Sequence, residues 1–149
     1  MSRLWAAALV VGVAAGGGDA RPDVPPAELA VPAEDLSKAR ELVRRLGNPS
    51  FQVREEATAE LARMGRGARA ALLDAVATSA DYEVRSRAAR LLPRAEADDL
   101  QARVAAFVAD ADGKFAHDLP GWEAFRAGVG ADKAARALFA ELLRAHENR

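Results

Sequence analysis

The stretch "SFQVREEA" at residues 50–57 returns in altered form as "DYEVRSRA" at residues 81–88, which is 31 positions further along the chain. The agreement extends past the quoted letters, and the matched pairs are Phe51 with Tyr82, Val53 with Val84, Arg54 with Arg85, Ala57 with Ala88, and Leu61 with Leu92. A period of this size is typical of helical repeat proteins, in which each unit contributes a pair of helices. The repeat therefore predicts a scaffold protein rather than an enzyme.

The composition favours an all-α fold. The chain has 149 residues, enough for one domain, and 37 of them are alanine, whereas only eight are aromatic. Alanine is the best helix former but fills little core volume. We therefore expect closely packed helices with thin cores.

The beginning of the chain reads as a targeting segment followed by a linker. Residues 1–20 place an arginine before an apolar run and then small residues, which is the layout of a secretory signal peptide. Residues 21–33 hold four of the seven prolines and predict an extended tether. There is no cysteine, which excludes disulfides, thiolate metal sites and a lipid-modified cysteine anchor. We expect an exported protein with no stable membrane insertion after signal cleavage.

Apolar residues at helical spacing continue from there nearly to the end of the chain. They predict helices over residues 36–46, 51–64, 68–76, 82–92 and 100–111, a short helical turn at 122–125, and a last helix over 135–143. Ser50 and Asp81 are the expected N-caps of the two repeated helices. Pro93 is expected to end the fourth helix, and the acid pair Asp98 and Asp99 then precedes the N-terminus of the fifth.

Each repeated position has an expected structural role. The valines should point back into the groove between helices, and the small alanines should let a neighbouring helix approach closely. The aromatic residue that opens each copy should pack over the preceding turn. Asp81 and Arg85, four residues apart, are expected to pair on one face of their helix.

The two segments "NPSFQVREEATAEL" and "SADYEVRSRAARLL" resemble the second-helix signature of HEAT-like repeats. The resemblance covers about residues 35–95. It implies a short α-solenoid of two helical hairpins, in which Arg54 and Arg85 tie adjacent units together. Ser50 departs from the pattern because an aspartate there would give Arg54 a charged partner. The tail, "LPGWEAF" followed by "RALFAELLRA", is similar to a segment of secreted bacterial proteins with such repeats whose function is uncharacterised.

We therefore divide the chain into a signal peptide at 1–20, a tether at 21–33, HEAT-like repeats at 34–97 and a helical C-terminal region at 98–149. Two units are fewer than the usual three of a self-sufficient solenoid. The C-terminal helices are thus expected to pack on the repeats and cover an exposed apolar end.

No motif for catalysis, a cofactor or a metal stands out. His117 and His146 lie far apart and outside any metal-ligand spacing, and each is expected to be solvated or to favour a helix C-terminus. The stretch "DADGK" at residues 110–114 has some features of a calcium loop but lacks its later ligands. We predict no catalytic residues.

Two sets of residues are candidates for binding. Trp122 and Phe125 either anchor their short helix in the core or form an exposed partner site, since tryptophan is enriched in binding hot spots. Arg63, Arg66 and Arg69 are the candidates for a nucleic-acid contact. Residues 38–94 carry twelve bases and seven acids within a chain of net charge −1, which is a weak electrostatic footprint for nucleic acid.

The sequence thus predicts an exported, non-catalytic scaffold that binds another protein of the envelope or outside the cell. The first alternative is a nucleic-acid-binding HEAT-like module that uses the three arginines. The second is an enzyme with an unrecognised site.

Overall fold

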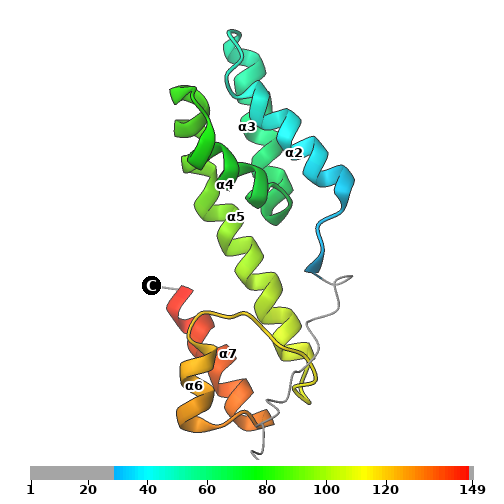
Figure 1. The fold of residues 1–149 in the computed structure, drawn as a ribbon, viewed down its shortest axis with the longest axis vertical. Coiled ribbons are helices and arrows are strands. Elements are labelled where there is room, and N and C mark those ends of the chain that lie inside the picture. The colour runs from blue at the N-terminus through cyan, green and yellow to red at the C-terminus, as the bar shows by residue number, and fades with distance from the viewer. Residues whose placement is uncertain (1–28, 148–149) are drawn as a thin grey trace, which may run out of the picture.

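The computed structural model describes residues 29–147, with side chains through Ala145, and this part of the chain is all-α, as predicted. The elements are α2 (Ala33–Arg45), α3 (Phe51–Met64), the 3-10 helix η1 (Gly65–Ala68), α4 (Arg69–Thr78), α5 (Tyr82–Ala109), α6 (Trp122–Val129) and α7 (Lys133–Glu147) (Figure 1). The predicted signal peptide at 1–20 and residues 21–28 of the predicted tether lie outside the described residues.

The helices from α2 to the first half of α5 share one core. α2 packs on α3 and α4, α4 packs on α5, and α3 also contacts α5 (Figure 1). Buried alanines and leucines dominate this N-terminal core, which consists of Ala39, Leu42, Leu46, Ala57, Leu61, Ala68, Ala71, Leu72, Ala75, Val84, Ala88 and Ala95. Ala57 and Ala88, the repeated alanines, are fully buried, as expected for positions where helices approach closely.

The two sequence copies adopt the same local structure at the start of α3 and α5. Arg54 Nη1 donates to the carbonyl oxygens of the two residues before Ser50, at 2.7 and 3.0 Å. Arg85 Nη1 donates to the carbonyl oxygens of the two residues before Asp81, at 2.7 and 2.9 Å. The arginine of each copy therefore closes the turn that leads into its own helix.

The caps of these two helices differ. Asp81 caps α5, because its carboxylate accepts hydrogen bonds from the backbone N–H of Glu83 at 2.7 Å and of Val84 at 3.4 Å. The expected cap by Ser50 is wrong, since its side chain forms no capping hydrogen bond in α3. The expected ion pair between Asp81 and Arg85 does not form. Asp81 caps the helix instead, and Arg85 donates to the carbonyl oxygens of the preceding turn.

The aromatic residues that open the two copies do not pack over the preceding turn, contrary to expectation. Phe51 is 65% exposed and Tyr82 is 74% exposed. Each ring lies beside the arginine three residues later, with ring-to-guanidinium distances of 5.7 Å for Phe51 and 5.9 Å for Tyr82. The repeated valines do turn inward, since Val84 is buried and Val53 is half-buried.

The predicted end of a helix at Pro93 is wrong, because Pro93 lies inside α5, which is 28 residues long. Proline removes the hydrogen bond to the carbonyl four residues earlier, here that of Ala89. Ala89 and Pro93 are both exposed, so this face of α5 is open to water that can solvate the carbonyl. Packing of the other faces of α5 holds the helix together across the defect.

Asp98 and Asp99 therefore lie inside a helix rather than at a helix N-terminus. Asp99 pairs with Arg103, one turn later on α5, at 3.2 Å. Asp98 lies against Gly65, where a Cβ would come within 2.5 Å of its carboxylate oxygen. The predicted boundary between residues 97 and 98 also falls within α5, so the two predicted regions share this helix.

A second core lies at the far end of α5. α7 contacts α5 and α6, and no contact joins α6 or α7 to α2, α3 or α4 in the described part of the chain (Figure 1). The C-terminal region therefore packs on the second half of α5 rather than across the end of the repeats. This C-terminal core is built from Val104, Phe107, Leu119, Trp122 and Phe139, with Leu100, Phe125, Ala131 and Leu143 beside it.

The last helix presents a different face to the core than its apolar pattern suggests. Phe139 is buried, but Leu138 and Leu142 are 51% and 52% exposed. Arg136, a charged residue, is only 4% exposed. Its burial is explained by the site described next.

Candidate functional site

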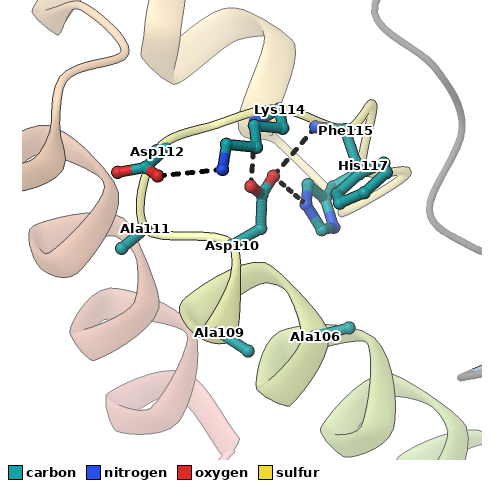
Figure 2. A pocket seen from close by; sticks show the side chains of 8 residues that line it. All are labelled: Ala106, Ala109, Asp110, Ala111, Asp112, Lys114, Phe115 and His117. Carbon is teal, nitrogen blue, oxygen red and sulfur yellow. Dashed lines mark hydrogen bonds and ion pairs between the residues drawn. The ribbon is translucent and has the colours of Figure 1, made fainter.

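A buried carboxylate organises the loop between α5 and α6. Asp110 is the C-cap residue of α5, and its Oδ1 accepts a hydrogen bond from the backbone N–H of Lys114 at 2.8 Å. Its Oδ2 accepts from the N–H of Phe115 at 3.0 Å and lies 2.9 Å from Nε2 of His117. Figure 2 shows these contacts converging on one side chain, so we call the set the Asp110 network.

Arg136 of α7 completes the Asp110 network from the opposite side. Its Nη2 lies 3.5 Å from Asp110 Oδ2 and donates to the carbonyl oxygen of Phe107 at 2.8 Å. The guanidinium carbon also sits 3.9 Å from the centre of the Phe107 ring, a cation–π contact. Arg136 thus joins the end of α5, the loop and α7.

All three ionisable side chains of the network are buried. The exposed fraction is 3% for the side chain of His117, 6% for that of Asp110 and 4% for that of Arg136. Burial raises the pKa of Asp110, but the N–H of Phe115, His117, the N–H of Lys114 and the charge of Arg136 together hold that pKa below its ordinary value. Asp110 is therefore ionised at neutral pH.

The network lines a hollow of about 230 Å³ in the loop (Figure 2). The other lining residues include Ala106, Ala109, Ala111 and Asp112, and the lining contains no hydroxyl or thiol that His117 could activate. Asp110 also accepts from N–H donors on both oxygens, so it is not arranged as a cation ligand. These contacts fit a structural role for Asp110, which holds the loop and α7 to the end of α5, better than a role in catalysis or in calcium binding.

The expectation that His117 is solvated is therefore wrong. A polar loop sequence hides the fact that Asp110, seven residues earlier, folds back over the histidine. The sequence signal for this burial was the spacing of Asp110, Gly113 and His117. Gly113 has a positive φ of 66°, which lets the loop turn under the Asp110 carboxylate and bring His117 to it. The side chain of His146 lies outside the described residues.

A second feature is the hollow between α3 and α5, which we call the α3–α5 groove. It has a volume of about 420 Å³ and is lined by Phe51, Glu55, Thr58, Arg87, Arg90 and Leu91. The lining thus combines an exposed aromatic ring and a half-buried leucine with charged side chains.

Arg87 forms the floor of the α3–α5 groove and ties the two repeat copies together. It is 8% exposed, and it contacts Glu55 of α3 at 2.7 Å and Glu83 of α5 at 2.6 Å. Its Nη1 also donates to Thr58 Oγ1 at 3.2 Å. The hydrogen bond from Arg87 is the main reason that the pKa of Glu83 is lowered.

Arg54 makes a second tie between the copies. Its Nε lies 3.6 Å from Oε1 of Glu83, so the next copy supplies a charged partner in place of the aspartate that position 50 lacks. The alignment of the two repeat copies gives no special place to the carboxylates of Glu55 and Glu83. Glu83 matches Gln52 at the 31-residue offset, so the acid is absent from the first copy.

The structure separates the two sets of predicted binding residues. Of the two alternatives for Trp122, core packing is the one observed, because the side chain is 2% exposed and its ring lies 4.8 Å from that of Phe107. An exposed partner site at Trp122 is therefore excluded. Phe125 is half-buried beside it, with ring centres 6.1 Å apart.

The three arginines of the predicted nucleic-acid contact already have partners within the chain. Arg63 pairs with Glu60, and Arg69 Nε lies 3.8 Å from Asp99. Arg66 Nη2 donates to the carbonyl oxygen of Ala30 at 3.4 Å. The turn therefore does not present three free cations on one surface.

Within residues 29–147, no helix has both the length and the apolar character required to span a membrane. The side chains described through Ala145 include no group of three or more histidine, aspartate or glutamate residues placed to hold a metal ion.

Comparison with known proteins gives no relative for this chain. No protein-family model, no curated protein and no solved structure matches it.

Proposed function

We propose that this protein is an exported, non-catalytic scaffold that binds another protein through two HEAT-like helical units. The observation that carries the proposal is the matched construction of α3 and α5. In both, an arginine of the repeated motif binds the same two carbonyl oxygens of the preceding turn, at distances that agree within about 0.1 Å. Repeated units of this kind create extended binding surfaces without catalytic groups.

The contacts between the two copies support a rigid surface. Arg87 links α3 to α5 through Glu55, and Arg54 links them through Glu83. Charge-assisted contacts of this kind fix geometry more than they add stability. The α3–α5 groove therefore keeps its shape when no partner is bound, which reduces the entropy lost on binding.

The two alternatives have less support. An enzyme needs a reactive group beside its acid or base, whereas the buried pair of His117 and Asp110 faces a hollow whose lining has no hydroxyl or thiol for the histidine to activate. Nucleic-acid binding through Arg63, Arg66 and Arg69 would require phosphates to compete with the partners these residues already have. Such binding would weaken steeply with salt, so retention on DNA at low salt that is lost at high salt would favour this alternative.

The export proposal depends on residues 1–20 alone. Its test is fractionation of source cells that express the chain with a C-terminal tag. We expect a shortened product in the envelope or the medium. Recovery of the full-length chain from the cytoplasm would contradict export.

The scaffold proposal is tested by affinity capture with the tagged protein from the envelope fraction after mild cross-linking. We expect a protein partner whose recovery saturates and is competed by an excess of untagged chain. The matched control is the same chain after thermal unfolding, which should recover no such partner. Capture that neither saturates nor responds to competitor would overturn the proposal.

A further inference from the structure

The α3–α5 groove carries an excess of positive charge that the described part of the chain does not neutralise. Arg54, Arg87 and Arg90 face the carboxylates of Glu55 and Glu83, so one cation is left over. The charge of Arg90 helps lower the pKa of Glu83, but Arg90 forms no ion pair with any of the side chains described, which are those of residues 29–145. The excess charge therefore lies at Arg90.

Arg94 extends this charge along α5. It follows Arg90 by four residues, which places both on the same face of the helix, and both are exposed. Arg94 likewise has no ion pair among the described residues. Two successive arginines on α5 therefore lie without an ion pair among the described residues, and the first of them, Arg90, lines the groove.

The same groove offers apolar surface at its rim. Phe51 is 65% exposed and is held by Arg54, whose guanidinium lies 5.7 Å from the ring centre. Leu91, half-buried, lies on the α5 side of the groove. An exposed aromatic ring held in place beside a leucine is a suitable contact for an apolar side chain.

We propose that the α3–α5 groove binds an acidic peptide segment of the partner, with an apolar side chain between Phe51 and Leu91 and carboxylates at Arg90 and Arg94. Charge complementarity favours an acidic segment, since arginine binds carboxylates with paired hydrogen bonds and neither guanidinium group has an ion pair among the side chains of residues 29–145. The inference rests on the proposed scaffold function and specifies the chemical class of its partner.

The test is selection of random twelve-residue phage-displayed peptides on the full-length chain. We expect the selected peptides to be enriched in Asp and Glu together with Leu, Ile or Phe relative to the starting library. Their synthetic versions are then measured by fluorescence anisotropy against the wild type and four variants, which are Arg90→Glu, Phe51→Ala, Arg40→Glu and Leu138→Asp. Circular dichroism and thermal melts confirm that each variant is folded.

Arg90→Glu should weaken binding by about tenfold or more, because it replaces attraction with repulsion, and Phe51→Ala should weaken it by about fivefold. Arg40→Glu is the matched control, because Arg40 is an exposed helical arginine of α2 without an ion pair among the side chains of residues 29–145. It carries the same charge change and should bind like the wild type.

The results separate the groove proposal from the scaffold proposal. Selected peptides without an acidic bias, or equal binding by wild type and Arg90→Glu, overturn the groove proposal. If those peptides instead fail to bind the Leu138→Asp variant, the scaffold proposal stands, with its binding surface on α7 rather than in the groove. If no peptide is enriched and affinity capture also finds no saturable partner, both proposals fail.

Discussion

Asp110→Asn tests whether the buried carboxylate holds the C-terminal core together. An amide keeps one acceptor oxygen and places an NH2 group at the other position. Oδ1 now accepts from Lys114 N–H, and Oδ2 from Phe115 N–H, so one backbone donor loses its acceptor in either orientation. Arg136, 3.5 Å away, also loses its contact with a negative charge.

The expected cost follows from these two losses. A hydrogen bond to a charged group contributes about 1.5–3 kcal/mol, and the loss of charge beside a buried arginine adds to it, so we expect about 2–4 kcal/mol in total. For a domain of this size the melting temperature should fall by roughly 8–16 °C.

The assay is urea unfolding followed by far-UV circular dichroism. Asp112→Asn is the matched control, since Asp112 lies in the same loop but its side chain is 76% exposed and pairs with Lys114 at the surface. It should cost less than about 0.5 kcal/mol. Equal free energies of unfolding for the two variants would refute the structural role of Asp110.

The pH dependence gives an independent check. The pKa of Asp110 is lower in the folded protein than its ordinary value near 3.8, so folding favours the ionised form. Its stabilising contribution is therefore complete above the pKa of the unfolded state and disappears as the pH falls through the lower, folded value. The stability difference between wild type and Asp110→Asn should therefore shrink as the pH falls below about 4. A difference that grows toward acid pH would contradict this assignment.

Three further predictions concern the helices. Asp81→Ala should destabilise the protein by about 1 kcal/mol through loss of its cap, whereas Ser50→Ala should be nearly neutral in the same urea titration; equal effects would contradict the different caps. Pro93→Ala should raise the melting temperature, because it restores a hydrogen bond inside a continuous α5 at a position where proline costs up to about 3 kcal/mol; no gain would support a break there. Phe107→Ala should cost about 3–5 kcal/mol because the ring is fully buried, while Val108→Ala, 44% exposed, should cost under about 1 kcal/mol, as measured by calorimetry.

Much of the N-terminal helical arrangement could be predicted because its information is local. Alanine content and the spacing of apolar residues indicate helices, and Gly47 with Pro49 marks the turn between α2 and α3. The 31-residue repeat predicted that Val84, Ala57 and Ala88 would lie inside, and they do. These features depend on neighbours a few residues apart, so a single sequence contains them.

The candidate sites could be predicted only in part, because they depend on residues that are distant in sequence. Arg54 was singled out as a tie between units, but its partner Glu83 is 29 positions away and is not part of the repeated pattern. Arg87 and Glu55, 32 positions apart, were not singled out at all. A buried arginine has the same sequence signature as an exposed one.

The helical class, the place of most turns and the duplicated start of α3 and α5 follow from the sequence alone, because backbone propensity and apolar spacing act over a few residues. The passage of α5 through Pro93 depends on tertiary packing, since the packing of its N-terminal and C-terminal halves on two separate cores outweighs one lost hydrogen bond. The joint burial of Asp110, His117 and Arg136 also depends on tertiary packing. Burying charge is favourable only where opposite charges and donors meet, and that meeting depends on how α7 and the loop fold back onto α5.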